Sequence, residues 1–237
     1  MGSYIANIND KFKYRQKRRY LEKSYILAIF GFMIGVLTGD IINSRAVESP
    51  EIYLKKLKAE FQAIGNYGKD WEIYRGDSFQ LRVNKPEELL LEGIKIKSSV
   101  KTIDKLDVRI ALGVGTINYE APSISESNGD VFIRSGEVLK KLIEEDLTMG
   151  FSSPWNEIDE RINLMLKLAV TFMDNWTTRM AEAVYHSLKN PGYTQKEIGA
   201  LLKIKQNTVS DLLSRARMNE VRQLINYFNK EIGHATG

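Results

Sequence analysis

Ile34-Gly-Val-Leu-Thr-Gly-Asp40-Ile-Ile-Asn-Ser-Arg45 is the stretch on which the interpretation of the fold depends. Residues 34–37 form a short apolar run with β-branched side chains, which predicts a buried strand. Thr38-Gly39 is expected to end this strand, so that Asp40 follows at its carboxyl end, where open α/β sheets present their ligands. Two interpretations of Asp40 remain open. It either caps the next turn or helix, or, because an unpaired buried charge is costly, it binds a divalent cation or a ligand hydroxyl.

The residues that follow alternate between helical and extended patterns. Gly76-Asp77 separates two segments of alternating character, which is typical of a tight β-hairpin. The predicted elements are a strand at 34–37, a helix from Ser49-Pro50 to Gly65-Asn66, strands at 71–75 and 78–83, a helix from Pro86, and an apolar, central strand at 108–115.

The order strand, helix, strand, strand, helix, strand is that of the split βαβ unit in the ferredoxin-like fold. Right-handed crossovers place both helices on one face of such a sheet and the first strand beside the hairpin. Asp40 would then lie near Asp77 at the hairpin tip. Two carboxylates at one sheet edge suit Mg²⁺, which takes few protein oxygens and shares a phosphate. The alternative is that Gly76-Asp77 serves only as a hairpin turn.

Four segments in this order resemble the catalytic domain of class III nucleotidyl cyclases, a fold shared with diguanylate cyclases and palm-type polymerases. They are residues 37–42, 73–80, 108–115 and 128–139. Gly39-Asp-Ile-Ile-Asn-Ser-Arg45 and Arg75-Gly-Asp-Ser-Phe-Gln80 resemble more closely the hallmark segments of the SatD family, bacterial proteins with the same strand order. The resemblance covers about residues 34–145.

The resemblance implies a magnesium ion held by Asp40 and Asp77 together with the main chain of Ile41. It also implies a nucleotide site, formed by Asn43, Ser44, Arg45, Arg75 and Gly76. Cyclases carry an asparagine and an arginine on the helix after the last motif, and Ile133 and Glu137 occupy the matching positions here. Without that cation a transferring phosphoryl group loses a major stabilisation. The catalytic residues are therefore unassigned, and ligand binding is favoured over turnover.

The remaining sequence predicts a helical second domain. A polar loop at 118–130 either lies over the site or is solvated, and a helix over about 133–145 closes the first domain. The chain is then predicted to be helical from Ser153-Pro154 onward, with Trp155 and Trp176 in packing positions. The expected divisions are a basic extension at 1–32, a cyclase-like domain at 33–149 and a helical domain at 150–237. The fold class is therefore α+β, followed by an all-α domain.

Residues 194–216 match the spacing of a helix-turn-helix of the sigma-region-four or MarR-like kind. Thr194 and Glu197 predict a capping box, and Gly199 occupies the position where the second helix approaches closely. The predicted buried side chains are Ile198, Leu201, Leu202, Ile204, Val209, Leu212 and Leu213. Lys203 replaces the usual glycine of the turn, and Lys205 replaces the usual capping serine.

Polar and basic side chains surround this turn and favour DNA binding over the alternative of a helical hairpin used for protein contact. Four polar residues are expected at base edges: Gln206, Asn207, Thr208 and Ser210. Five basic residues are expected at phosphates: Lys196, Lys203, Lys205, Arg215 and Arg217. The apolar stripe Val221, Leu224, Ile225 and Phe228 either packs on the domain or forms a dimer seam.

Composition sets the broader class. The 237-residue chain has no cysteine and a formal net charge of +4, which suits a cytoplasmic protein and permits nucleic-acid binding. Residues 1–23 are strongly basic, and an apolar run follows at 25–37. This run is shorter than the roughly 20 residues that span a bilayer, so a basic extension is favoured over a membrane anchor. A further alternative is that Met33 is the natural start.

The sequence therefore predicts a cytoplasmic DNA-binding regulator with a domain that senses a nucleotide or a metal–nucleotide complex. Its expected partners are duplex DNA, a nucleotide and a second copy of the chain, and Mg²⁺ is the expected cofactor. A membrane partner is not expected. The alternatives are a metal-dependent nucleotidyl cyclase or nucleotidyltransferase that carries a DNA-binding domain, and a non-catalytic interaction module.

Overall fold

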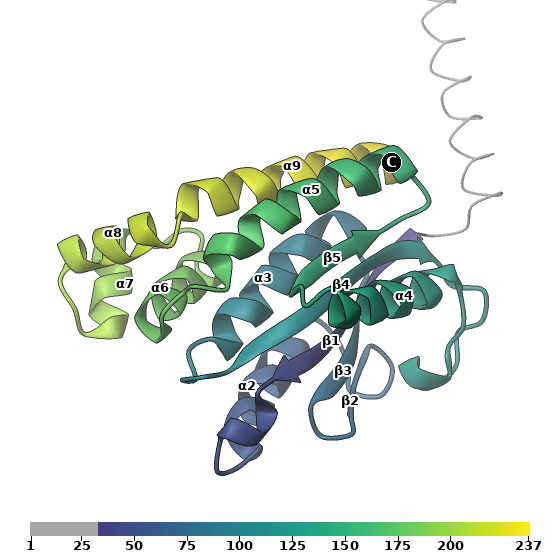
Figure 1. The fold of residues 1–237 in the computed structure, drawn as a ribbon, viewed down its shortest axis with the longest axis horizontal. Helices are drawn as coiled ribbons and strands as arrows, with labels where there is room; N and C mark the ends of the chain where they lie inside the picture. Colours follow the sequence, from purple (N-terminus) through teal and green to yellow (C-terminus); the bar gives the residue numbers. More distant parts are fainter. Residues whose placement is uncertain (1–32) are drawn as a thin grey trace, which may run out of the picture.

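A five-stranded mixed sheet with helices on both faces forms the centre of the computed structural model, which describes residues 33–237 (Figure 1). The strands are β1 (Met33–Ile42), β2 (Trp71–Tyr74), β3 (Ser78–Val83), β4 (Asp107–Thr116) and β5 (Met149–Ser152). Their order is β2-β3-β1-β4-β5, and every neighbouring pair is antiparallel except β4 and β5. The predicted α+β class is thus confirmed, and β1 lies beside the hairpin strand β3.

Eight α-helices belong to the described part of the chain. They are α2 (Glu51–Gln62), α3 (Leu89–Val100), α4 (Asp130–Glu144), α5 (Asn156–Met173), α6 (Thr178–Lys189), α7 (Gln195–Leu202), α8 (Gln206–Arg215) and α9 (Met218–Thr236). Three short 3-10 helices, η1 (Ser44–Ala46), η2 (Pro86–Glu88) and η3 (Ile124–Glu126), complete the structure. The expectations for the basic extension, the membrane anchor and the start at Met33 concern residues 1–32 and lie outside the described residues. No helix within 33–237 is long and apolar enough to span a membrane.

The two faces of the sheet carry different helices. Helices α2 and α3 cover one face, where the ring of Phe61 lies 5.0 Å from that of Phe79. Helix α4 covers part of the other face, where Thr38 donates a hydrogen bond to Ser135 at 2.9 Å. Side chains alternate across a strand, so Asp40 and Thr38 of β1 share the α4 face. This alternation decides which residues can surround Asp40.

Strand β1 is longer than the sequence predicts. It runs from Met33 to Ile42 without a break, so Thr38-Gly39 does not end it and Asp40 lies within the strand. Pairing on both sides explains this: Gly39 is opposite Phe79 of β3 and Ile110 of β4. The expected position of Asp40 after the strand is therefore wrong by two residues.

Strand β5 is absent from the sequence prediction, and it contains the predicted domain boundary at 149/150. It pairs in parallel with β4, and Gly150 lies opposite Ala111 in this pairing. Its outer edge is covered by Asn163 of α5, whose amide accepts a hydrogen bond from the Phe151 N–H at 2.9 Å and donates one to the Phe151 carbonyl at 2.8 Å. The amide side chain thus replaces a further strand.

One hydrophobic core runs from the sheet into the helical part. Phe151 of β5 packs edge-on against Phe228 of α9 at 5.1 Å between ring centroids, and both belong to the same buried cluster. Figure 1 shows α9 lying along α5 above the sheet. The apolar stripe of α9 therefore packs on its own chain, which decides between the two alternatives left by the sequence.

A buried charge cluster also joins the two parts. Lys97 of α3 is fully buried and pairs with Asp107 at 2.7 Å and with Asp174 at 2.8 Å. Lys101 pairs with Asp107 at 2.9 Å and donates to the Asp174 carbonyl at 2.7 Å. Because each buried charge has an opposite partner, the cluster offsets the cost of desolvation. It holds the α5–α6 junction against the start of β4.

Candidate functional site

Asp40 lies between two polar neighbours at the end of the sheet. Its Cα is opposite Ser78 of β3 and opposite Arg109 of β4, so all three side chains point to one face. Ser78 donates its hydroxyl to Oδ1 of Asp40 at 3.3 Å. Asp40 is half-buried, which leaves part of the carboxylate accessible to a ligand.

The hairpin tip brings Asp77 against the end of β1. The Ile41 N–H donates to the Asp77 carbonyl at 3.1 Å, and the Ser44 hydroxyl donates to Oδ2 of Asp77 at 2.9 Å. Gly76 has φ of 89°, a left-handed conformation that glycine adopts without strain. The Tyr53 hydroxyl of α2 fixes the same turn through the Gly76 carbonyl at 3.2 Å. The predicted hairpin is thus present, and its tip meets β1 as expected.

The surroundings of Asp40 change the pKa of its carboxyl group. Burial raises the pKa of Asp40, and the nearby charge of Asp77 raises it further. The Ser78 hydrogen bond and the Arg109 guanidinium partly oppose that rise in the Asp40 pKa. Burial and the Asp77 charge also raise the pKa of Tyr53. The site is therefore one where negative charge accumulates and where a cation would relieve repulsion.

The donor set fits a hard cation that keeps several waters. Asp40 and Asp77 offer carboxylate oxygens, and Ser44 and Ser78 offer hydroxyls next to them. No group of three or more His, Cys, Asp or Glu side chains with metal-binding geometry occurs in residues 33–237. A protein site with two carboxylates agrees with Mg²⁺, which completes its octahedron with water and phosphate, better than with Ca²⁺, which takes six to eight oxygens.

The residues predicted to bind a nucleotide are only partly brought together. Gly76 lies at the hairpin tip, and Ser44 of η1 contacts Asp77 there. Asn43 adopts φ of 60° and donates its side-chain amide to the Lys105 carbonyl at 3.2 Å, away from Asp77. Arg45 and Arg75 are exposed and form no ion pair with another described residue. Both remain available to an anionic ligand near the hairpin.

Helix α4 carries Ile133 and Glu137, the residues at the positions where cyclases have an asparagine and an arginine. Ile133 is 57% exposed, and Glu137 is exposed as well. Arg134 is engaged elsewhere: it pairs with Asp130 at 3.1 Å and donates to the Ser153 carbonyl at 2.6 Å. These contacts hold Arg134 at Asp130 and Ser153 rather than at the Asp40–Asp77 pair.

Arg109 is a residue that sequence reasoning missed. It forms an ion pair with the exposed Asp146 at 2.9 Å, and its Nε atom is buried without a hydrogen-bond partner in the described structure. The sequence signal was a single charged residue inside an otherwise apolar strand at 108–115. Only the register with β1 shows that Arg109 lies opposite Asp40.

The polar loop at 118–130 lies at the other end of the sheet. Ser123 donates to Glu72 of β2 at 3.0 Å, and Glu120 pairs with Arg82 of β3 at 2.7 Å. These contacts tie the loop to the end of β3 that is distant from Ser78. The loop does not cover the Asp40–Asp77 pair.

Helices α7 and α8 form a second candidate site. The predicted capping box is present: the Thr194 hydroxyl accepts from the Glu197 N–H at 3.3 Å, and the Glu197 carboxylate accepts from the Thr194 N–H at 2.7 Å. An added Cβ on Gly199 would lie 2.7 Å from the Ile204 carbonyl oxygen, so the chain after the turn approaches as closely as predicted. Lys203 adopts a left-handed conformation with φ of 55°, which explains why glycine is usual there.

Most residues of the α7–α8 segment are exposed or buried as the sequence predicts. All nine residues predicted to contact DNA are exposed, and Val209, Leu212 and Leu213 are buried behind them. Leu201 is an error, because it is 51% exposed rather than buried. Arg215 pairs with Asp211 at 3.2 Å and Arg217 with Glu220 at 3.8 Å. Those two arginines are therefore weaker candidates for phosphate contact than the lysines.

Comparison with known proteins adds no family to this description. No model of a known protein family matches the chain, and no curated protein is significantly similar to it. The class that the observations define is an α+β protein with a five-stranded mixed sheet, a carboxylate pair at the sheet end and a helical part packed on the same core.

Proposed function

We propose that the protein is a DNA-binding transcription regulator, and that its sheet domain is a ferredoxin-like, cyclase-like module that senses a nucleotide with Mg²⁺. The observation that carries the proposal is the geometry of α7, the turn and α8. A capped first helix, a close contact at Gly199 and a left-handed Lys203 are the features that a helix-turn-helix requires.

The exposed start of α8 supports recognition of base edges. Gln206 and Asn207 carry amides that can pair with adenine in the major groove, and both are exposed at the first turn of the helix. Lys205 directly precedes them and forms no ion pair with another described residue. It suits contact with a phosphate, which positions the helix without reading the sequence.

The sensing role is supported by the carboxylate pair and by the strand order. Strands β2, β3, β1 and β4 follow one another in the sheet as the split βαβ unit requires. Asp40 and Asp77 meet where that unit presents ligands, and the raised pKa of Asp40 follows from burial and from the charge of Asp77. Bound Mg²⁺ would neutralise this negative charge and would link a phosphate to the site.

The DNA assignment is tested with the full chain and a library of random duplexes. Gln206→Ala or Asn207→Ala is expected to reduce the preference for particular bases in the selected duplexes. The expected loss of discrimination is about 1–3 kcal/mol for each lost bidentate base contact. Lys205→Met is expected to weaken binding to all sequences and to reduce the salt slope by about one. Asn229→Ala and Lys230→Met change exposed residues on α9 and serve as matched controls. Binding that is absent, or that is insensitive to salt, contradicts the proposal.

The ligand assignment is tested by thermal melts with Mg²⁺ and each common nucleotide. The wild type is expected to gain stability only with metal and nucleotide together, by mass action. Asp40→Asn and Asp77→Asn should each abolish that gain while leaving the fold intact without metal. A purely structural role predicts that both variants lose stability whether or not metal is present. The metal assignment fails if no nucleotide and no divalent ion shifts the melting temperature of the wild type.

A second candidate function is a metal-dependent nucleotidyl cyclase or nucleotidyltransferase. The observation in its favour is the same carboxylate pair, with Arg109 as a cation opposite Asp40. Product analysis after incubation with labelled nucleotides and Mg²⁺ separates the two functions. Turnover that is lost in Asp40→Asn supports the enzyme, and binding without product supports the sensor.

The proposed regulator is also expected to act as a homodimer, since helix-turn-helix proteins commonly bind two half-sites one helical turn apart. The apolar stripe of α9 is not available as its seam, because Val221 and Phe228 are buried against the rest of the chain. Analytical ultracentrifugation with and without duplex DNA measures the oligomeric state.

A further inference from the structure

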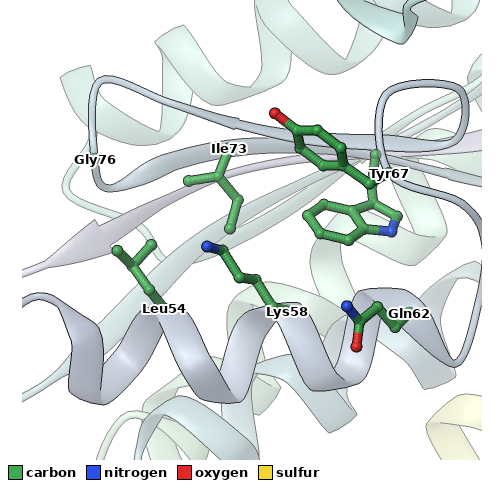
Figure 2. A pocket seen from close by; sticks show the side chains of 7 residues that line it. Leu54, Lys58, Gln62, Tyr67, Ile73 and Gly76 are labelled. Atoms are coloured by element: carbon green, nitrogen blue, oxygen red, sulfur yellow. The ribbon is translucent and has the colours of Figure 1, made fainter.

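A groove separates helix α2 from the edge strand β2, on the face of the sheet opposite α4. Figure 2 shows its walls: one row of side chains rises from the helix and another descends from the strand and the preceding loop. The groove is lined by Leu54, Lys58, Gln62, Tyr67, Trp71, Ile73 and Gly76. Its volume of about 480 Å³ lies within the range of ligand pockets.

The floor and one wall of the groove are apolar and aromatic. Trp71 is 2% exposed, and its indole N–H donates to the Gly65 carbonyl at 3.0 Å, which holds the ring in place. Tyr67 packs its ring edge against Trp71 at 5.0 Å between centroids, yet Tyr67 is 70% exposed. A large ring that is held on one side and open on the other offers a stacking surface to an aromatic ligand.

The opposite wall supplies one positive charge. Lys58 lies one helical turn from Leu54 and one from Gln62, so the three side chains share a face of α2. In Figure 2 the Lys58 ammonium extends across the groove toward Ile73. It forms no ion pair with any other described residue. A cation beside an apolar wall is complementary to a ligand that combines an anionic group with an apolar part.

We propose that this groove binds a small aromatic carboxylate, with the ring between Tyr67 and Ile73 and the carboxylate on Lys58. The groove opens on the sheet face opposite the Asp40 side chain, and only its end at Gly76 adjoins the hairpin tip that carries Asp77. A ligand carboxylate placed on Lys58 rather than at that end avoids repulsion by Asp77. The basic segment at 1–23 is a poor occupant, because its charge has the same sign as that of Lys58. Charge complementarity thus favours a free organic anion over this part of the chain.

The experiment titrates the full chain with indole-3-acetate and with its neutral analogue indole-3-acetamide. Ligand-observed NMR measures binding, since the protein has its own tryptophans. The carboxylate is expected to bind with a Kd of about 1 mM or lower, and the amide at least about fivefold more weakly. Lys58→Met keeps the apolar stem of the side chain and should weaken carboxylate binding by the same factor without affecting the amide.

Matched variants separate the groove from general surface effects. Lys56→Met removes the same charge from the same helix. Burial lowers the pKa of His186 in α6, and the nearby charge of Lys56 adds to that lowering, so Lys56 lies toward α6 and away from the groove. Tyr67→Ser should weaken both probes at least about fivefold. Tyr119→Ser alters another exposed tyrosine, which does not line the groove, and should change neither.

Three results overturn the proposal. The first is the absence of carboxylate binding at about 5 mM, well above the expected Kd. The second is equal affinity of Lys58→Met and wild type. The third is self-association of the free protein that Tyr67→Ser abolishes, because the groove would then be occupied by a second copy. None of these measurements uses DNA or nucleotide, so a negative result leaves the regulator proposal standing.

Discussion

Replacing Gly199 by alanine tests whether a close contact defines the turn between α7 and α8. The added Cβ would lie 2.7 Å from the Ile204 carbonyl oxygen, a backbone atom that cannot move without shifting the turn. Alanine also improves the helix propensity by about 1 kcal/mol. Overpacking of this kind costs about 1–3 kcal/mol, so the net effect ranges from about neutral to a loss of about 2 kcal/mol.

Gly136→Ala is the matched control. Gly136 lies within α4 and is exposed, and an added Cβ there would meet no atom within 4 Å. The same gain in propensity therefore appears without the contact and should raise the melting temperature by roughly 2–4 °C for a chain of this size. The difference between the two variants isolates the contact and is expected to be about 1–3 kcal/mol.

Urea denaturation and differential scanning calorimetry of the two variants provide the measurement. Gly199→Ala should melt below Gly136→Ala and should also lose affinity for DNA, because the displaced turn carries α8 with it. The reasoning is refuted if Gly199→Ala is stabilised as much as Gly136→Ala, since the close approach would then be absent.

Three further predictions concern the carboxylate site, the buried charges and the helix cap. The pKa of Asp40 is higher in the folded than in the unfolded protein, so the free energy of unfolding falls as the pH rises through the unfolded-state pKa and then the folded-state pKa. Asp40→Asn should flatten this part of the pH–stability curve. An unchanged curve would contradict the prediction. Lys97→Met removes the ion-pair partner of Asp174 and leaves Asp107 paired with Lys101 alone. It should cost about 3–5 kcal/mol in urea unfolding, whereas Lys140→Met, at an exposed 3.9 Å pair, should change nothing measurable. Thr194→Ala removes the cap of α7 and should cost about 1 kcal/mol, with Thr194→Ser as the variant that restores stability.

Local patterns in the sequence determined most of the secondary structure and the surface of α8. The Gly76-Asp77 hairpin follows from a turn dipeptide between alternating strands, and the cap at Thr194 follows from the spacing to Glu197. Both depend on residues three or four positions apart, so no distant contact is needed to predict them. The exposure of Gln206 and Asn207 follows in the same way from the apolar period of α8.

The extent of β1, the presence of β5 and the packing of α9 depend on contacts between residues that are far apart in the sequence. Strand β1 continues through Thr38-Gly39 because β3 and β4 pair with it on both sides, and short local signals cannot report such partners. Strand β5 is four residues long and is held by β4 and by the Asn163 amide, which lies in a helix that follows it. The stripe of α9 is amphipathic whether it packs on another copy or on its own chain, and only the fold places Phe228 against Phe151.

The candidate site shows the same division. The sequence alone singled out Asp40 and Asp77, because an acidic residue after an apolar run and an acidic residue in a turn are visible locally. The opposition of Arg109 to Asp40 depends on the register between β1 and β4, where a shift of one residue would turn every side chain to the other face. The groove beside Lys58 depends on the distance between α2 and an edge strand. Periodicity reports which face of an element is apolar, but the space between two elements is set by how all the side chains of the core pack together.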